Sequence, residues 1–289
     1  MIGRLRRAVD WRMRAVTDRL DAIAARVEAG AEDTAELRRS VDALQPLLRA
    51  VVEEESANRR RLLALRDTAA HDEPYTTADP LVSVTIATRD RPQLLCERAL
   101  PSILAQTHSH LEVVVVGDAA AAEVGAAVAA LGDARVRYAN LSQRITAHPD
   151  PLRHWLVGSA MARNEATRLA LGSWTLSFDD DDHLRPDAIA VLLELARESR
   201  AEVAYGGFAQ HFPDGHAENH VAFPPRQGEF GWQGALVHGG LSFFGRELIA
   251  ADLGVPGDAY LLRRMLRAGV RFAALERPVW DYHPSHLRG

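Results

Sequence analysis

The sequence predicts an α/β protein in which a mostly parallel sheet, covered by helices, follows an α-helical, coiled-coil-like segment. From residue 81 to residue 208, runs rich in β-branched residues alternate with segments of helix length, which is typical of a parallel sheet with helices on both faces. Before residue 70 the chain is charged and rich in Ala and Leu, without strand-like alternation. With 289 residues and 47% hydrophobic content, the chain can form one catalytic domain and carry an appendage.

Residues 1–70 show the hydrophobic spacing of a coiled coil. Between Val9 and Leu65, apolar residues recur at alternating intervals of four and three, as at the two apolar positions of a heptad. The pattern is imperfect, because Pro46 removes a helical N–H and polar residues occupy some of the apolar positions. Three roles remain open: these helices form a homo-oligomer, pack on the catalytic domain, or attach to a membrane surface.

Residues 71–80 are expected to form a linker, since they mix Pro, Thr and acidic residues without periodicity, and the catalytic domain then spans 81–289. We expect strands at 81–87, 111–117, 135–141, 174–178, 202–208 and 241–244, and a last extended segment at 270–284. We expect helices at 92–106, 119–131, 159–171, 186–199 and 258–267. The irregular stretch 209–234 is long enough to indicate a functional loop.

Composition excludes several classes of protein. The formal net charge of −5 provides no basic field for attracting phosphates, so we expect no nucleic acid partner. All 34 residues of the Lys and Arg count are arginines, so guanidinium or backbone N–H groups must make any phosphate contact. Cys96 is the only cysteine, which excludes a disulfide and a cysteine-based zinc site within one chain. Because there is no long apolar run and no apolar signal-peptide core, we expect a soluble cytoplasmic protein, with a membrane surface as the alternative location.

Four consecutive aspartates, Asp179–Asp182, follow the predicted strand at 174–178. Four adjacent carboxylates repel one another unless a cation lies among them, and oxygen ligands of this kind suit Mg²⁺ or Mn²⁺. The alternative is a solvated acidic turn that caps the helix beginning at Pro186. Position favours the metal, because ligands of open α/β sheets bind beyond the carboxyl ends of the strands, where Asp90 and Asp118 are also expected.

Two long stretches of the domain resemble the inverting family 2 glycosyltransferases, which have the GT-A fold. They are VSVTIATRDRPQLLCERALPSILAQT, after the linker, and ARNEATRLALGSWTLSFDDDDHLRPDAI, around the acidic run. The resemblance extends from about residue 81 to residue 285. It implies a nucleotide-diphosphate sugar as donor and Mn²⁺ or Mg²⁺ as the cofactor.

The resemblance also implies roles for individual residues. Those expected to bind the nucleotide sugar are Thr88, Arg89, Asp90, Asp118, Arg163, Asp179 and Asp180. Thr88 and Asp90 are expected beside the base, Asp118 accepts from the base N–H, and Arg163 lies near the nucleotide or its diphosphate. Asp179 or Asp180 lies near the ribose, while Asp181 binds the metal. The sequence departs from the family pattern at Gly117, where an acid is frequent, and at Ala119 and Ala120, which replace Gly-Ser.

The expected catalytic base is Asp258, with Glu247 and Asp252 as the next candidates. The family has an acid at the start of a late helix, and Gly257 stands where a Glu often precedes it. The alternative role for Asp258 is that of a helix N-cap. A histidine near the C-terminus often completes the metal shell in related enzymes, and His283 is expected to do so rather than His286.

These expectations define one reaction and two alternatives. The reaction is the transfer of a single sugar, with inversion, to an unknown hydroxyl acceptor, which is a glycan, lipid, protein or small molecule. A nucleotidyltransferase is the first alternative, but the chain has neither a Gly-rich phosphate loop nor a lysine to hold a triphosphate. The second is an inactive transferase-like domain on a coiled-coil scaffold, which the missing acids at Gly117 and Gly257 would explain.

Overall fold

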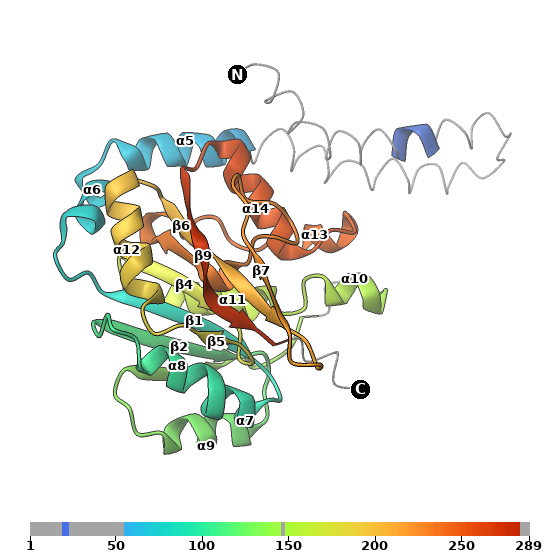
Figure 1. The fold of residues 1–289 in the computed structure, drawn as a ribbon. Coiled ribbons are helices and arrows are strands. Elements are labelled where there is room, and N and C mark those ends of the chain that lie inside the picture. Colours follow the sequence, from blue (N-terminus) through green and yellow to red (C-terminus); the bar gives the residue numbers. More distant parts are fainter. Residues whose placement is uncertain (1–18, 23–54, 146–147, 284–289) are drawn as a thin grey trace, which may run out of the picture.

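The computed structural model describes residues 19–22, 55–145 and 148–283, which form a nine-stranded sheet with helices on both faces (Figure 1). The strands are β1 (Val82–Thr88), β2 (Leu111–Gly117), β3 (Val136–Asn140), β4 (Trp174–Phe178), β5 (His183–Leu184), β6 (Val203–His211), β7 (Ala217–His220), β8 (Ala235–His238) and β9 (Phe272–Tyr282). Their order in the sheet is β3-β2-β1-β4-β8-β6-β9-β5, with β7 paired to β6. The predicted α/β class is confirmed.

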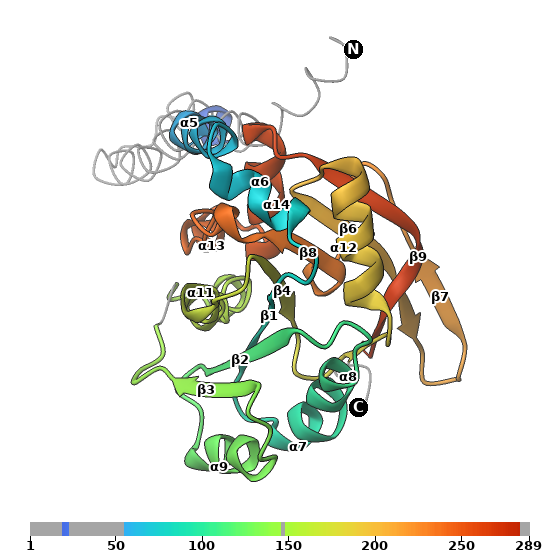
Figure 2. The same cartoon turned by 90° about the vertical axis from the view of Figure 1, so that its left-hand side faces the viewer.

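The helices of the described residues lie on both faces of the sheet and beside it. They are α5 (Glu55–Arg66), α6 (Ala69–Thr76), α7 (Pro92–Leu94), α8 (Leu100–Leu104), α9 (Ala122–Ala130), α10 (Pro151–Trp155), α11 (Ala160–Leu169), α12 (Ala188–Ser199), α13 (Ile249–Asp252) and α14 (Gly257–Ala268). One π-helical turn, Leu95–Ala99, joins α7 to α8. Figure 2 shows α11 and α14 on one side of the sheet and α8 and α12 on the other.

The first four strands form the parallel half of the sheet. β1 pairs in parallel with β2 and with β4, and β2 pairs in parallel with β3. Every residue of β1 and β2 is buried, as expected for apolar runs covered on both faces. Because Thr88 is paired with Gly117, the carboxyl ends of β1 and β2 lie level at one edge of the sheet, and β4 ends at the same edge. This edge receives the polar loops that follow the three strands.

The second half of the sheet corrects one predicted strand. β8 pairs antiparallel with β4 and β6, while β6 and β9 are parallel. The strand expected at 241–244 is wrong, because the strand in this region is Ala235–His238 and a 3₁₀ turn, Gly239–Leu241, follows it. Gly239 and Gly240 directly follow β8. Leu241 is buried in the 3₁₀ turn, and Phe244 is buried in the loop after it.

The stretch preceding the sheet differs from the expected linker. Residues 69–76 are the helix α6, in which His71, Pro74 and Tyr75 are buried. Tyr75 donates to the backbone oxygen of Ala201, and its ring meets that of Trp174 edge-on at 5.3 Å. Burial of these rings against the domain favours a helix that local composition does not predict.

The N-terminal segment is described only in part. Most of the predicted heptad positions lie outside the described residues, but Leu62 is fully buried in the cluster that includes Leu241, Leu261 and Met265. Leu65, the other apolar heptad position in α5, is partly buried against the same cluster, so both apolar heptad positions of this helix pack on the domain. Among the described residues there is no helix of the length and apolar character that a membrane span requires.

Candidate active site

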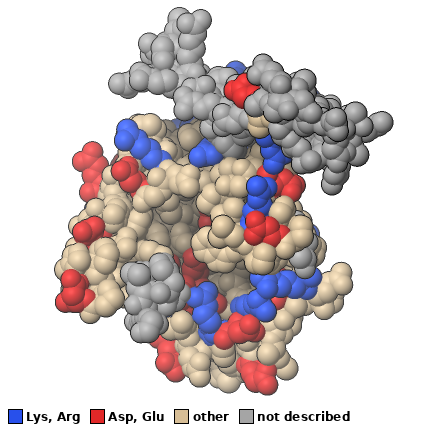
Figure 3. Space-filling model, turned by 90° about the vertical axis from the view of Figure 1, so that its right-hand side faces the viewer, with Lys and Arg blue, Asp and Glu red and all other residues tan. Residues whose placement is uncertain are grey.

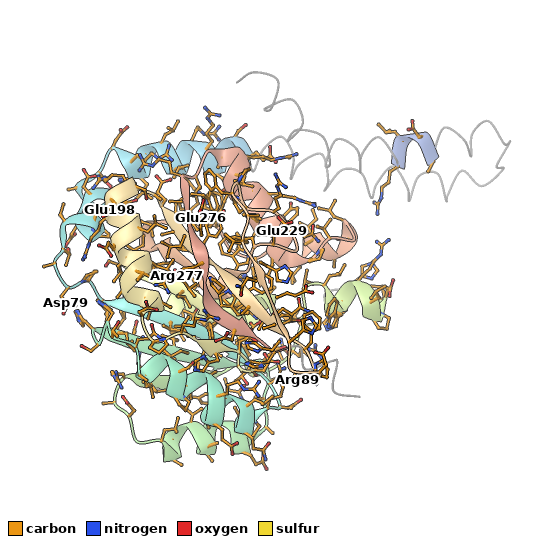
Figure 4. All side chains as sticks on the ribbon, viewed as in Figure 1. Asp79, Arg89, Glu198, Glu229, Glu276 and Arg277 are labelled. Carbon is orange, nitrogen blue, oxygen red and sulfur yellow. The ribbon has the colours of Figure 1, made fainter. Side chains whose placement is uncertain are left out.

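Three polar loops meet at the carboxyl edge of β1, β2 and β4. Figure 4 labels Asp79, which precedes β1, and Arg89, which follows it, at opposite ends of the domain. The β1 turn, Asp118 after β2 and the acidic run after β4 therefore share one side of the molecule. Seen from the side on which α10 lies, the surface has a hollow with acidic side chains inside it and basic side chains at its border (Figure 3).

A cavity of about 460 Å³ occupies this edge, which we name the donor cavity. Its lining contains all the residues predicted to bind a nucleotide sugar, namely Thr88, Arg89, Asp90, Asp118, Arg163, Asp179 and Asp180. The buried carboxylate of Asp118 lies 3.4 Å from Arg144 Nε, and burial raises the pKa of Asp118 although Arg144 opposes the shift. The exposed side chains of Arg89 and Asp90 form an ion pair of 3.1 Å at the entrance.

The four aspartates after β4 divide into two groups. Asp180 accepts a hydrogen bond from Thr88 and lies 2.6 Å from Arg91 Nη2, and burial raises its pKa to about 6. The second group is Asp179, Asp181 and Asp182: one carboxylate oxygen from each of these residues lies within 4.8 Å of the other two. These three carboxylates have the chemistry and spacing for a hard divalent cation.

Asp182 provides the test of whether a cation fits this group. Its Oδ1 accepts a hydrogen bond from the backbone N–H of His283, but its buried Oδ2 has no hydrogen-bond partner. Burial, with the charge of Asp179, raises the pKa of Asp182 to about 9. A buried carboxylate oxygen without a donor is unfavourable, so a divalent cation at this position would satisfy it.

Two arginines flank the carboxylates from opposite sides. Arg91 donates to Asp181 at 2.5 Å, and Arg163 donates to Asp179. Although burial alone would lower it, the Asp179 carboxylate holds the pKa of Arg163 above its usual value. Asp179 also accepts from Gln233 Nε2 at 2.6 Å, and its pKa lies below the usual range because Arg163 outweighs the effect of burial.

Asp258 lies in the first turn of α14, at a second cavity of about 480 Å³, which we name the acceptor cavity. The N-cap of α14 is Pro256, so Asp258 does not have the N-cap position that was its alternative role. Its Oδ1 accepts from Arg246 Nε at 3.0 Å, and its side chain is half exposed. Trp155 and Asp179 line both cavities, so Asp258 faces a space that adjoins the donor cavity.

The other candidate bases lie elsewhere. Glu247 forms an ion pair with Arg264, and Asp252 is at the end of α13. Neither residue lines the donor or the acceptor cavity. Asp258 is therefore the one of the three carboxylates that borders the acceptor cavity.

The predicted histidine ligand lies beside the carboxylates without being part of their group. The ring of His283 stacks on that of His211 at 4.7 Å, and its backbone N–H donates to Asp182. His283 as a metal ligand therefore stays a prediction, and His286 lies outside the described residues.

Several residues of the site were missed in the sequence. They are Arg91, Arg144, Gln233 and Arg246, while Asp182 was predicted only as part of the run of four aspartates. The turn TRDRP and the four aspartates carried a signal for Arg91, because so many adjacent carboxylates need a cationic neighbour. For Arg144, Gln233 and Arg246 there was no local signal, since only the fold brings these distant residues to the site.

Of the two missing acids, the one at Gly117 has a structural explanation and the one at Gly257 has none. A Cβ on Gly117 would collide with Asn140 Oδ1 and the Tyr138 hydroxyl, so this chain has no room for the usual acid. Asn140 instead exchanges two hydrogen bonds with the backbone of Ala120, which holds the turn after β2. At Gly257 a Cβ would lie 3.4 Å from the nearest backbone oxygen, an ordinary contact.

Two curated relatives match parts of this chain. Succinoglycan biosynthesis protein ExoO of Rhizobium meliloti (strain 1021) is 36% identical over 107 residues, which are 37% of this chain and 27% of that protein. WcaA of Escherichia coli (strain K12), named for colanic acid biosynthesis and as a glycosyl transferase, is 32% identical over 117 residues, which are 40% of this chain and 37% of that protein. The chain thus matches well under half of the length of either relative.

The fold resembles that of S. aureus TarS, residues 1-349, solved in complex with UDP. The TM-score is 0.54 at 16% sequence identity, over 71% of this chain and 60% of that one. Residues 83–251, more than half of the chain, match the family Glycosyl transferase family 2. By this match, the chain belongs to glycosyltransferase family 2.

Proposed function

We propose that this protein transfers a single sugar from a nucleotide-diphosphate sugar to a hydroxyl acceptor, with inversion and with the help of Mn²⁺ or Mg²⁺. The observation that carries the proposal is the pair of adjoining cavities, with a three-carboxylate group at Asp179 between them and Asp258 on the far side. TarS, which has a similar fold, has been solved with UDP and with UDP-GlcNAc, and this supports a nucleotide-diphosphate sugar as the donor.

The donor cavity accommodates the nucleotide and its diphosphate. Asp118 accepts from a base N–H, and the Arg163 guanidinium lies close enough to the carboxylate group to contact a phosphate. Asp179, Asp181 and Asp182 would hold the cation, and His283 is the predicted additional ligand. A divalent cation bound there would supply positive charge beside the diphosphate of the leaving nucleotide.

Asp258 is the general base in this proposal. One of its oxygens is held by Arg246, and no described residue donates a hydrogen bond to the other. That second oxygen takes the proton of the acceptor hydroxyl while the acceptor oxygen bonds to the anomeric carbon. The bond from this carbon to the diphosphate oxygen breaks on the opposite side, so the configuration is inverted. General-base catalysis of this kind contributes about 10² to 10⁴ in rate.

The lining of the acceptor cavity favours an uncharged sugar ring as the acceptor. Its walls carry the amides of Gln210, Gln227 and Gln233 and the aromatic side chains of Trp155, Phe208, Phe230, Trp232, Trp280 and Tyr282. No arginine is among the described lining residues, so an anionic acceptor would face Asp258 without a counter-charge. Amides that bond hydroxyls and flat apolar faces suit a neutral carbohydrate.

The test is a thermal-shift screen of UDP-, GDP- and dTDP-sugars with and without MnCl₂. A nucleotide sugar at a hundred times its dissociation constant should stabilise the folded state by about 2.7 kcal/mol, and the shift should require the metal. Absence of binding by any nucleotide would contradict the proposal and favour the inactive scaffold. Binding of nucleoside triphosphates in preference to nucleotide sugars would favour the nucleotidyltransferase.

A further inference from the structure

Two neighbouring residues of α11 contact different parts of the site. Arg163 donates to Asp179 in the donor cavity, whereas the side chain of Asn164 pairs with the main chain of Arg246. Asn164 Nδ2 donates to the Arg246 carbonyl at 2.8 Å, and the Arg246 N–H donates to Asn164 Oδ1 at 2.8 Å. Two reciprocal hydrogen bonds fix both the position and the direction of this peptide unit.

We name these two hydrogen bonds the clamp, and the side chain of Arg246 extends from it to Asp258. It is 8% exposed, and its Nε donates to Asp258 Oδ1 at 3.0 Å. Its Nη2 lies 3.4 Å from Ser177 Oγ, which also accepts from Arg163 Nη1 at 3.1 Å. The guanidinium therefore contacts Asp258 on one side and the β4 residue shared with Arg163 on the other.

The charges in this chain of contacts are balanced in pairs. Burial lowers the pKa of Arg246, and Arg163 lowers it further, while the carboxylate of Asp258 opposes both effects. Two buried guanidiniums that meet at Ser177 repel each other, and the carboxyl groups of Asp179 and Asp258 beside them offset this repulsion. The contact with Arg246 also fixes the position of Asp258 Oδ1.

We propose that Asn164 is a positioning residue that acts through Arg246 to orient Asp258 toward the acceptor hydroxyl. This inference rests on the proposed function, in which Asp258 is the general base. Neither Asn164 nor Arg246 lines the donor or the acceptor cavity, so neither residue touches a ligand there. A displacement of a base by about 1 Å can lower turnover by about a hundredfold, so the clamp affects the rate without touching a substrate.

The experiment measures release of nucleoside diphosphate from the nucleotide sugar that gives the largest thermal shift with Mn²⁺. We expect Asn164→Ala and Arg246→Gln each to lower kcat by about 10- to 100-fold and to leave the KM of the nucleotide sugar within about twofold. Asn164→Asp keeps the oxygen that accepts from the Arg246 N–H but loses the donor, so its kcat should be intermediate. Arg246→Lys should also be intermediate, because the charge remains without the planar guanidinium.

A double-mutant cycle separates positioning from a merely structural role. In an Asp258→Asn background, Asn164→Ala and Arg246→Gln should lower kcat by less than about twofold more, since the residue that they orient is already lost. The matched control is Arg264→Gln, which removes another buried arginine that contacts the same loop at Gly245 without reaching Asp258. This control should lower the melting temperature and keep kcat.

The outcomes are distinguishable. Full and multiplicative losses in the Asp258→Asn background, or an unchanged kcat in folded Asn164→Ala and Asn164→Asp, would overturn the inference. An unchanged kcat in Asp258→Asn, or no nucleotide-sugar binding at all, would instead overturn the proposed function. Nucleotide-dependent thermal shifts measured on every variant show which of them are folded.

Discussion

Thr88 Oγ1 donates a hydrogen bond of 2.6 Å to Asp180 Oδ2, so the last residue of β1 is tied to the acidic run that follows β4. Arg91 lies 2.6 Å from the other oxygen of the same carboxylate. Neither Asp180 Oδ1 nor Asp182 Oδ2 accepts a hydrogen bond, but Asp180 Oδ1 lies in the ion pair with Arg91, whereas Asp182 Oδ2 is in no ion pair among the described residues. The two neighbouring aspartates should respond differently to metal and to substitution.

Asp182→Asn should abolish stabilisation by Mn²⁺, whereas Asp180→Asn should largely keep it. Without metal, Asp182→Asn should be more stable than the wild type, because the pKa of Asp182 is raised from 3.8 to about 9 by burial. A carboxyl with a raised folded-state pKa destabilises the protein increasingly as the pH rises from about 4 to about 9, and the amide does not titrate. Melting temperatures across this range, with and without MnCl₂, measure both effects. Equal loss of the Mn²⁺ response in both variants would contradict the division of the aspartates into two groups.

Asp258→Asn should lower turnover by about a hundredfold or more, because an amide cannot take the acceptor proton. Its Oδ1 can still accept from Arg246, so nucleotide-sugar binding and its metal dependence should persist. Steady-state rates at saturating donor measure the loss, with hydrolysis of the donor by water as the assay until an acceptor is found. Asp252→Asn is the matched control, since Asp252 borders neither cavity. Wild-type rates in Asp258→Asn would move the base to another residue.

His238 should make the protein less stable as the pH falls from about 6.5 to about 4. This buried imidazole accepts from the Gly240 N–H at Nδ1, and its Nε2 lies 3.1 Å from the His71 carbonyl oxygen, so only the neutral tautomer with hydrogen on Nε2 satisfies both contacts. Burial lowers the pKa of His238 from 6.5 to about 4, so the unfolded chain binds the proton first and stability falls with pH. The loss amounts to about 3 kcal/mol.

Unfolding free energies of the wild type and His238→Phe between pH 4 and pH 7 check this expectation. The variant should be less stable near pH 7, because it leaves the Gly240 N–H unpaired, but its stability should depend less on pH. Parallel pH dependences in the two proteins would show that another group is responsible.

A chain that begins at Glu55 should fold, whereas one that begins at Thr77 should lose stability. The second truncation removes the fully buried Leu62 and the partners Arg66 and His71 of the fully buried Glu202. Arg271 then remains as the ion-pair partner of Glu202 among the described residues, and removing one partner of a buried ion pair costs up to about 3 to 5 kcal/mol. Thermal melts of the two truncated chains and the full chain measure the difference. Equal melting temperatures would show that α5 and α6 are dispensable for the domain.

The same proteins test the role predicted for the N-terminal helices. If the predicted N-terminal helices associate through their heptad positions, light scattering should show an oligomer for the full chain and a monomer for the chain from Glu55. The same mass for both would remove the homo-oligomer and leave helices that pack on the domain.

Local sequence was sufficient for the parallel half of the fold. β1 and β2 were predictable because runs rich in β-branched residues, of strand length and alternating with segments of helix length, are typical of a parallel sheet covered on both faces. The position of the donor cavity was predictable from these strands, since polar residues directly after parallel strands share the carboxyl edge of the sheet. The helix Ala69–Thr76 and the strand Ala235–His238 were not predictable, because tertiary burial rather than local periodicity decides their conformation.

The acceptor side of the site shows the other limit of sequence reasoning. Asp258 was a candidate base by its position in the sequence. Its partner Arg246 lies 12 residues before it, and Asn164, which hydrogen-bonds the main chain of Arg246, lies 82 residues earlier still. Neither Arg246 nor Asn164 belongs to a recognisable local pattern for a base. Such long-range pairs are fixed by packing, so only the folded chain reveals them.

Trp155 gives the molecule a built-in optical reporter. Its indole is 75% exposed and borders both cavities, whereas Trp174, Trp232 and Trp280 are 0%, 4% and 3% exposed. A ligand in the donor cavity borders Trp155 and no other described tryptophan, whereas a ligand in the acceptor cavity also borders Trp232 and Trp280. A change in intrinsic fluorescence on addition of a nucleotide therefore reports on the surroundings of Trp155, without any label.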